Sequence, residues 1–589
     1  MRDSSKIKHL AALALAAALV LTGCAQIPTQ SGVSGRTLGE VDAGDVFFKA
    51  TGPKKGATPQ EIVDGYIFAQ AAGLNDNWQV AREFLTEQAS AKWNPTHGVS
   101  IYAGDVELTP TNAPPPEDDQ APTPHTTSTD PEKLTAISID GRAKLSGTVD
   151  GGGHFTEAVA GSDFDQTYDL VRDSSGEWRI ASVSEGIIMS ISNFQSIYRS
   201  ASIYFLSLDD QYLVPEVRWV PRVKSETYAI AALLAGPSPW LRDAVQTAIP
   251  DSTRLLYDSV STEGGQAVVN LSTEVLSATS AQRTLVVSQI EATLTKLPGI
   301  RSVSIESNSI QIDSPSDPNL IRDPILASNP VVLQDNQLVT LNGHDVTPIS
   351  ERATLEGHDV TALAISDERA HGVFLDQHTS LWRIANVGKS PELLLEGGSL
   401  LAPSIDRFGW VWTGESRQVG NADGKLTVLT NPTTVGEVTA PWLSGRSIQA
   451  LSVAHDGTRI AVVSTGSSGT QIDVAGITRD DKGAPSALSD PITVGGQVVQ
   501  VSHLRWVDES TLAVVAQGAS SDSTGLYSVP ISGRSELIAP VDEVASLGVG
   551  RGLRSVYVGT EDDRVLTRST SGSSWTELLT GARLPTFPG

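Results

Sequence analysis

The feature that most constrains the fold of this chain is a series of paired, strand-like apolar segments in its C-terminal part. The pairs start at residues 360, 401, 448, 501 and 545, so successive starts lie 41, 47, 53 and 44 residues apart. A repeat of about 40 to 50 residues built from strands alone is typical of propeller blades, so the sequence predicts a β-propeller over 329–589. Five repeats are visible, and the segments 331–333 and 338–339 could supply a sixth, which predicts about five to six blades.

Two of these repeats contain more specific sequence motifs. Asp456 and Gly457 lie in the segment 451–461, and this pair of residues favours the tight turn of a β-hairpin. The segment resembles the blade hairpin of TolB-type propellers. His358 is followed 24 residues later by Trp382, and this arrangement resembles a WD repeat. Both resemblances indicate a β-propeller.

The first folded region, 58–195, combines helices with strands. Pro59 follows Thr58 as a first-turn proline does, and apolar residues continue at helical spacing to residue 69. A second helix is predicted over 78–85, and alternating apolar residues indicate several strands after it. This order is similar to that of NTF2-like α+β domains. The stretch 110–131 holds many prolines and acids without bulky apolar residues, which predicts a disordered insertion.

A second α+β unit is predicted over 198–312. Its expected elements are strands at 202–206, 213–220 and 267–271, a helix at 228–235, and a second helix that ends before Pro298 and Gly299. Ser280 is expected to cap the second helix. This order resembles that of GerMN domains, which occur in spore-germination and cell-envelope proteins. The resemblance supplies no catalytic residues.

Residues 1–23 have the anatomy of a secretory signal, with a basic start and an unbroken apolar run of twelve residues at 10–21. As a helix this run would be about 18 Å long, which is too short for the roughly 30 Å hydrocarbon core of a bilayer. The sequence Leu21-Thr22-Gly23-Cys24 resembles the bacterial lipobox. The resemblance implies cleavage between Gly23 and Cys24 and a Cys24 that carries S-diacylglycerol and N-palmitoyl chains. Residues 24–57 would then tether the protein to the extracytoplasmic face of the cell membrane.

Charge and motif content argue against several classes of function. The formal net charge is -26, and beyond the basic start no dense Lys/Arg cluster appears except the pair Lys54 and Lys55. Nucleic acid is therefore not expected as a partner. Cys24 is the only cysteine, so no internal disulfide can form. The sequence lacks the signatures of zinc proteases, serine hydrolases, P-loop NTPases and Rossmann enzymes, so we expect no catalytic residues, cofactor or metal.

The histidines and tryptophans leave two alternatives. A metal cluster at the propeller axis would need several of the ten histidines to converge, whereas hydrogen bonding within blades is the simpler interpretation. Trp410 and Trp412 alternate along a predicted strand, so they could form a stacking platform for envelope glycans. Most of the eleven tryptophans are expected to fill the space between blades instead.

The complete order of signal, NTF2-like unit, GerMN unit and propeller resembles the actinobacterial LpqB lipoprotein family along nearly the whole chain. The resemblance implies a non-catalytic accessory protein of the MtrA-MtrB two-component system. Its partner would be the extracytoplasmic domain of the sensor histidine kinase MtrB, and it would affect envelope homeostasis, division and sporulation. An envelope glycan- or cell-wall-binding lipoprotein is the alternative. An envelope hydrolase stays open as well, because propeller active sites assemble from distant loops.

Overall fold

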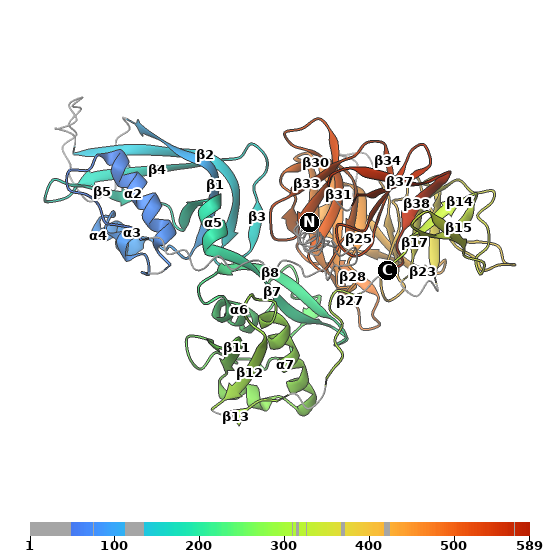
Figure 1. Cartoon of the computed structure of the whole chain (residues 1–589), viewed down its shortest axis with the longest axis horizontal. Helices are drawn as coiled ribbons and strands as arrows, with labels where there is room; N and C mark the ends of the chain where they lie inside the picture. Colours follow the sequence, from blue (N-terminus) through green and yellow to red (C-terminus); the bar gives the residue numbers. More distant parts are fainter. Residues whose placement is uncertain are drawn as a thin grey trace, which may run out of the picture. The chain divides into compact units, whose positions relative to one another are not determined.

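The computed structural model describes residues 49–589 except residues 75, 112–134, 309, 314–316, 325–326, 367–370, 417–423 and 570–571. The predicted signal, most of the predicted tether and nearly all of the predicted disordered insertion therefore lie outside the described residues. The described chain consists of two successive α+β regions and a long region of strands that also contains the 3-10 turn η2 Pro441–Leu443 (Figure 1). This order confirms the multidomain fold class expected from the sequence.

The N-terminal unit, Pro59 to Ile197, is built on a six-stranded sheet. The sheet order is β5-β4-β2-β1-β6, and β3 pairs with β2. Helix α2 packs against β2, β5 and β6, which places the hydrophobic core between the helix and the sheet. The elements are α2 Pro59–Ala72, α3 Gln79–Arg82, α4 Glu87–Lys92, β1 Gly98–Thr111, β2 Ala136–Asp150, β3 Phe155–Glu157, β4 Asp163–Arg172, β5 Trp178–Ser182, β6 Ile187–Ser190 and α5 Ile191–Ile197. The likeness to NTF2-like domains stays a prediction.

Helix α2 begins where the sequence predicted. The Thr58 side chain accepts a hydrogen bond from the backbone N–H of Glu61, and the Glu61 carboxylate accepts one from the backbone N–H of Thr58. This capping box satisfies two backbone donors that the first turn leaves free. The predicted helix over 78–85 is shorter than expected. Helix α3 ends at Arg82 because Leu85 leaves the helix to form a β-bridge with Ile180.

The middle unit, Tyr198 to Gln311, has two small sheets and two main helices. The sheet orders are β8-β7-β9 and β10-β11-β12-β13. Helices α6 and α7 pack against each other and against β7. Thr279, and not Ser280, caps α7, since its side chain accepts from the backbone N–H of Gln282. The elements are β7 Tyr198–Ser207, β8 Leu213–Pro221, α6 Ser225–Leu234, β9 Val245–Gln246, β10 Ser261–Glu263, β11 Gln266–Asn270, η1 Thr273–Ser277, α7 Ser280–Leu294, β12 Ser302–Ser307 and β13 Ile310–Gln311.

The C-terminal region contains six sheets of at least four strands among the described residues from Val331 onward. Five sheets take their strands from one stretch of sequence each. They are β17 Val360–Ile365, β18 Gly372–Asp376, β19 Ser380–Arg383 and β20 Glu392–Glu396; β21 Ser404–Ile405, β22 Val411–Gly414, β23 Leu426–Asn431 and β24 Thr434–Val438; β25 Ser447–Val453, β26 Arg459–Gly466, β27 Gly469–Arg479, β28 Pro485–Leu488 and β29 Ile492–Val494; β30 Val498–Trp506, β31 Thr511–Gly518, β32 Thr524–Pro530 and β33 Glu536–Pro540; and β34 Val544–Val549, β35 Val556–Thr560, β36 Arg564–Arg568 and β37 Trp575–Thr580.

The remaining sheet closes the propeller by combining the two ends of this region. Its order is β16-β15-β14-β38, with β14 Val331–Gln334, β15 Gln337–Asn342, β16 Asp345–Pro348 and β38 Ala582–Thr586. Strand β14 pairs antiparallel with β38, which comes from the end of the chain. The sequence shows only five complete strand pairs, because the innermost strand of the sixth sheet, β38, comes more than two hundred residues after its partner, β14.

Candidate functional site

Among the described residues, no group of three or more His, Cys, Asp or Glu side chains is placed to hold a metal ion. His358 illustrates what a blade histidine does here. Its Nδ1 lies 2.7 Å from Oδ2 of Asp376, and its ring packs against Phe374 and Trp382. His358 and Trp382, which the sequence paired by spacing, therefore meet inside one blade.

The structure contradicts the proposed stacking platform at Trp410 and Trp412. The side chain of Trp412 is 0% exposed, and its Nε1 donates to the carboxylate of Asp406 at 3.2 Å. Trp410 is half-buried against the same hydrophobic cluster, which joins two neighbouring blades. Trp412 cannot stack on a glycan because adjacent blades cover both faces of its sheet.

Gly23 and Cys24 lie outside the described residues, so the cleavage site and the lipidation of Cys24 stay predictions. Within the described chain, no helix combines the length and the apolar character needed to cross a bilayer.

Charged and polar side chains form contacts between the three units, and we call these residues the interdomain junction. It comprises Asp150, His154, Glu157, Asp209, Glu216, Arg218, Ser238, Arg407, Asp456, Arg459 and Ser535. Each pair of units is joined by at least one side chain of this set.

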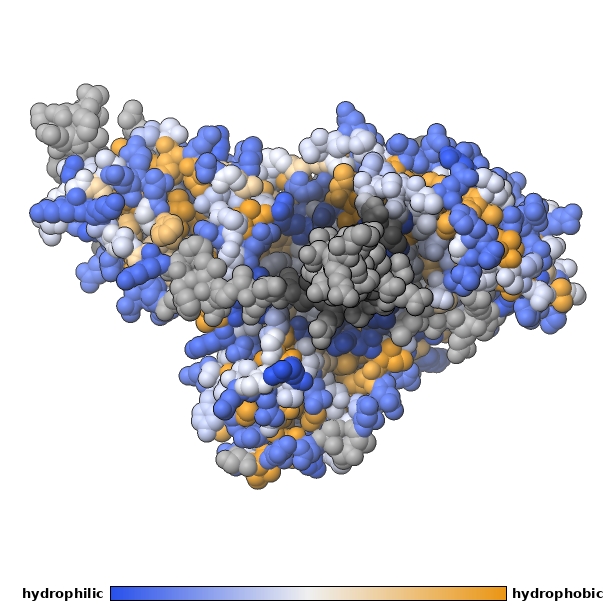
Figure 2. Space-filling view, in the orientation of Figure 1, coloured by the Kyte–Doolittle hydropathy of each residue, from blue (hydrophilic) through white to orange (hydrophobic). Residues whose placement is uncertain are grey.

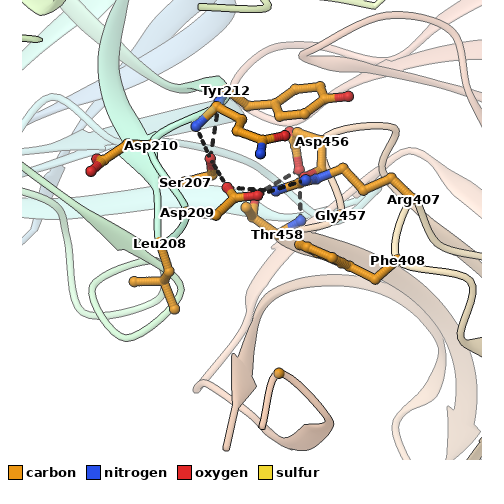
Figure 3. A network of polar contacts seen from close by, with 12 residues as sticks. Ser207, Leu208, Asp209, Asp210, Tyr212, Arg407, Phe408, Asp456, Gly457 and Thr458 are labelled. Carbon is orange, nitrogen blue, oxygen red and sulfur yellow. Dashed lines mark hydrogen bonds and ion pairs between the residues drawn. The ribbon is translucent and has the colours of Figure 1, made fainter. Parts of the chain in front are cut away.

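Asp209 of the middle unit forms a two-bond ion pair with Arg407 of the propeller (Figure 3). Both nitrogen–oxygen distances are 2.8 Å. Asp209 lies in the turn between β7 and β8, and the hydroxyl of Ser207 donates to its Oδ1 at 2.6 Å. Burial would raise the pKa of Asp209, but the hydrogen bonds from Arg407 and Ser207 outweigh burial and lower the pKa. Asp209 is thus held as a carboxylate in this contact.

Arg407 is also held from its other sides. Its Nε donates to the backbone oxygen of Asp456 at 2.7 Å, and its guanidinium lies 4.3 Å from the ring centre of Tyr212 and 3.9 Å from that of Phe408. Two aromatic rings and three hydrogen bonds use the planar shape of the guanidinium, which a lysine could not reproduce.

Asp456 occupies the hairpin turn that the sequence assigned to it. Its Oδ1 accepts from the backbone N–H and the hydroxyl of Thr458 at 2.8 and 2.6 Å, and its Oδ2 pairs with the guanidinium of Arg459. Gly457 follows with a φ of 70°, which a glycine adopts without strain. Arg459 is fully buried and also donates to the backbone oxygen of Glu509 at 2.8 Å. The turn is therefore a rigid base for the contact with Arg407.

The N-terminal unit reaches the middle unit through His154. Its Nε2 lies 3.1 Å from Oε1 of Glu216 and 2.6 Å from the hydroxyl of Ser238, and its Nδ1 lies 2.9 Å from Oδ2 of Asp150. Glu216 is 1% exposed and pairs on its other side with Arg218 at 2.9 Å. A buried carboxylate thus lies between a histidine and an arginine from two different units.

The partners of His154 and Glu216 shift the pKa values of both side chains. Burial opposes the charged form of His154, but hydrogen bonds and charges from Asp150 and Glu216 outweigh it and raise the pKa of His154 to about 9. Burial likewise opposes ionisation of Glu216, but the hydrogen bond with His154 and the charge of Arg218 lower its pKa to about 2. The contact is fully charged at neutral pH, and its charges neutralise one another.

The N-terminal unit also bonds directly to the propeller. The carboxylate of Glu157 accepts from the backbone N–H and the hydroxyl of Ser535 at 2.8 and 2.5 Å. The amide of Gln497 donates to the backbone oxygen of Ala158 at 2.7 Å. Gly496 allows this approach, because a Cβ there would lie 2.7 Å from the backbone oxygens of both Glu157 and Ala158.

Sequence reasoning did not single out Asp209, His154, Glu216 or Arg407. One local signal was available in the glycine run that precedes His154. A Cβ at Gly153 would lie 2.7 Å from the backbone oxygen of Trp219, so only glycine permits the close strand contact found there. The paired charges and hydrogen bonds of the junction run between all three units, so its geometry serves to hold the units together.

Comparison with protein families divides the chain into three matched stretches. Residues 52–195 match a family described as "Lipoprotein LpqB, N-terminal domain", and residues 336–588 match "Lipoprotein LpqB beta-propeller domain". Residues 202–313 match a family described as "Sporulation and spore germination".

Curated relatives match over nearly the whole chain. A protein named Lipoprotein LpqB from Thermobifida fusca is 24% identical and covers 97% of this chain and 97% of its own length. The Bifidobacterium longum protein of the same name is 24% identical over 98% of each chain. The Mycobacterium tuberculosis protein of that name is 24% identical over 85% of each. Among solved structures, the first GerMN domain of the sporulation protein GerM from Bacillus subtilis is 24% identical over 21% of this chain and 93% of its own, with a TM-score of 0.17.

Proposed function

Because the chain belongs to the LpqB lipoprotein family, we propose that it is a non-catalytic accessory protein that binds and regulates a membrane sensor histidine kinase of the MtrB type. The named lipoprotein relatives indicate a membrane-anchored lipoprotein. We place the protein on the extracytoplasmic face, held there by lipid on Cys24, with the extracytoplasmic domain of the kinase as its partner.

The observation that carries this proposal is the interdomain junction. The paired charges of Asp209 with Arg407 and of His154 with Glu216 bind the N-terminal unit, the middle unit and the propeller to one another. A protein whose modules are fixed in this way can present one continuous recognition surface. Binding such a surface then costs little ordering entropy.

The surface suits a contact that forms and dissociates. On the face drawn in Figure 2, most described residues are hydrophilic and the hydrophobic residues form several separate groups. Interfaces between partners that also exist alone are about as polar as the rest of the surface. A lipid anchor would raise the effective concentration of such a surface near a membrane partner to roughly the millimolar range, so weak contacts suffice.

Regulation then follows from differential binding. The protein shifts the kinase only if it binds one conformation of the sensor domain better than the other. A tenfold preference corresponds to about 1.4 kcal/mol, which a few polar contacts supply.

The test is photo-crosslinking in intact membranes followed by affinity capture. Recovery of a histidine kinase with a large extracytoplasmic domain is the expected result, and its absence at full expression of both proteins would refute the proposal. A Cys24→Ala variant retains the folded units but loses the anchor, so its kinase crosslinks and signalling should both weaken. Undiminished signalling by that variant would show that regulation of the kinase does not require the lipid anchor.

The glycan-binding alternative loses its best support. The platform that would have carried it requires the face of Trp412, and that face is buried.

A further inference from the structure

A cavity of about 260 Å³ lies between the sheet that closes the propeller and the sheet that follows it in sequence. Val331 on β14 and Leu338 on β15 line it from the closing sheet, and Ile365 on β17 and Gly372 on β18 line it from the next sheet. Protein interiors are close-packed and contain few voids larger than a water molecule. An opening of this size between two sheets is therefore a candidate for a ligand site.

The floor of the cavity is apolar. Its buried side chains are those of Val331, Leu338, Ile365 and Ile384, and all four belong to the hydrophobic cluster that joins the two sheets. While the cavity is empty, these side chains lack dispersion contacts on one side, so an apolar group that fills it gains them. An apolar cavity of about 150 Å³ holds a benzene ring, so this one is large enough for an aliphatic or aromatic side chain.

The mouth of the cavity carries one acid and one strong base. Glu351, His371 and Asn386 are exposed there, and Arg352 is half-buried beside them. Glu351 takes part in none of the ion pairs between described residues. A carboxylate and a guanidinium therefore border the same apolar floor.

Both charged residues lie on a segment that is already fixed. Arg352 forms a β-bridge with Asn386, and its Nη1 donates to Oδ1 of Asn386 at 2.9 Å. The backbone N–H of Val387 donates to the backbone oxygen of Glu351 at 2.9 Å. A guanidinium has five N–H donors, so its contact with Asn386 is compatible with a further bond to a carboxylate. Because the mouth is held in place before a ligand arrives, binding costs less ordering entropy.

The two charges at the mouth select the head group of a ligand. A ligand with only a carboxylate would gain Arg352 but face repulsion from Glu351, and a ligand with only an ammonium group would gain Glu351 but face repulsion from Arg352. A zwitterion satisfies both, because a guanidinium forms two parallel hydrogen bonds with a carboxylate and a carboxylate accepts from an ammonium group. The volume lies below the roughly 300–1,000 Å³ of pockets for drug-sized ligands, so the ligand is a small molecule.

We propose that this cavity binds a free α-amino acid with an apolar side chain. The side chain of the ligand lies on the apolar floor, its carboxylate binds Arg352 and its ammonium group binds Glu351. The site lies between two propeller sheets and does not rest on the proposed contact with a kinase.

The test is isothermal titration calorimetry of the full chain with L-leucine, L-phenylalanine and glycine. Leucine, phenylalanine or both should bind with saturation, because they bring an apolar side chain to the floor. Glycine has the same two charges without a side chain, so it should bind about tenfold or more weakly. Leucinamide and N-acetylleucine each lack one charge, and each should also bind about tenfold or more weakly than leucine.

Two variants separate the roles of the two charges. Glu351→Gln should weaken leucine binding about tenfold but should not weaken binding of N-acetylleucine, which has no ammonium group. Arg352→Gln should weaken leucine binding by a similar factor but should not weaken binding of leucinamide, which has no carboxylate. Glu392→Gln is the matched control, because Glu392 pairs with Arg383 in the second of the two sheets and does not line the cavity. It should leave the affinity for leucine unchanged.

A lack of saturation with both leucine and phenylalanine would overturn the proposal, as would equal affinities for leucine and glycine. Leucine affinities that are unchanged in both mouth variants would overturn the assignment of the head group to Arg352 and Glu351. So would variants that remain folded in thermal unfolding but weaken leucine, leucinamide and N-acetylleucine alike.

Discussion

Asp209 and Arg407 join the middle unit to the propeller through two hydrogen bonds of 2.8 Å, although 198 residues separate them along the chain. Asp209 is held by Ser207 in its turn, and Arg407 is held by the backbone of Asp456. Both partners are thus pre-positioned, so the ion pair gains more than a typical surface pair between two mobile side chains.

Arg407→Ala should loosen this contact without unfolding either unit. The backbone amides of Gln211 and Tyr212 bond to Ser207 next to the ion pair, so their hydrogen exchange should accelerate by about tenfold, the equivalent of about 1.4 kcal/mol. Mass spectrometry of the peptide that covers 207–212 measures this change. The control is Lys425→Ala, which removes an exposed ion pair with Glu437 inside one blade and should leave that peptide unchanged. Unaltered exchange in the Arg407 variant would mean that other contacts hold the turn.

Gly496→Ala should separate the N-terminal unit from the propeller locally. The backbone of Gly496 does not require a glycine conformation, but the added Cβ would lie 2.7 Å from the backbone oxygens of Glu157 and Ala158. Overpacking of this kind costs about 1–3 kcal/mol. The amide of Ala160, which donates to the oxygen of Gly496 at 3.1 Å, should exchange faster. Gly398→Ala is the matched control, because nothing lies within 4 Å of a Cβ at that position.

The contact between His154 and Glu216 should depend on pH in a defined window. The pKa of His154 is raised from 6.5 to about 9, so its stabilisation is complete below pH 6.5 and is lost as the pH rises through about 9. The pKa of Glu216 is lowered from 4.5 to about 2, so its stabilisation is complete above pH 4.5 and is lost as the pH falls through about 2. The contact should therefore be most stable between pH 4.5 and 6.5.

NMR titration of the His154 imidazole measures this dependence directly. Glu216→Gln removes one of its two acidic partners and should lower the pKa of His154 towards 6.5. An unperturbed pKa in the parent chain would contradict the geometry of the contact.

Trp412→Ala should destabilise the propeller by about 3–5 kcal/mol, because it empties a fully buried site and leaves a carboxylate oxygen of Asp406 with one donor fewer. Trp410→Ala should cost clearly less, since Trp410 is only half-buried. Thermal unfolding of the two variants measures the difference. Equal, small losses in both would indicate that Trp412 is accessible and would restore the stacking hypothesis.

Local patterns were sufficient to predict several parts of this structure. Thr58 and Pro59 begin helix α2 because a capping side chain and a fixed φ act within one turn of the chain. Asp456 and Gly457 form their hairpin turn for the same reason. The strand repeat predicted the propeller, because a strand pair keeps its period in sequence wherever the blade lies in space.

The tertiary structure alone decided which distant residues meet. Strand β38 completes a sheet with β14, and Asp209 meets Arg407, but no local period carries this information. Trp412 shows the same limit, since alternation along a strand places it on a face but cannot tell whether another blade covers that face. The sequence by itself determined the units and their order. Burial and charge pairing arise only when segments far apart in sequence come together. They determined which residues of those units lie in the core and which form contacts between units.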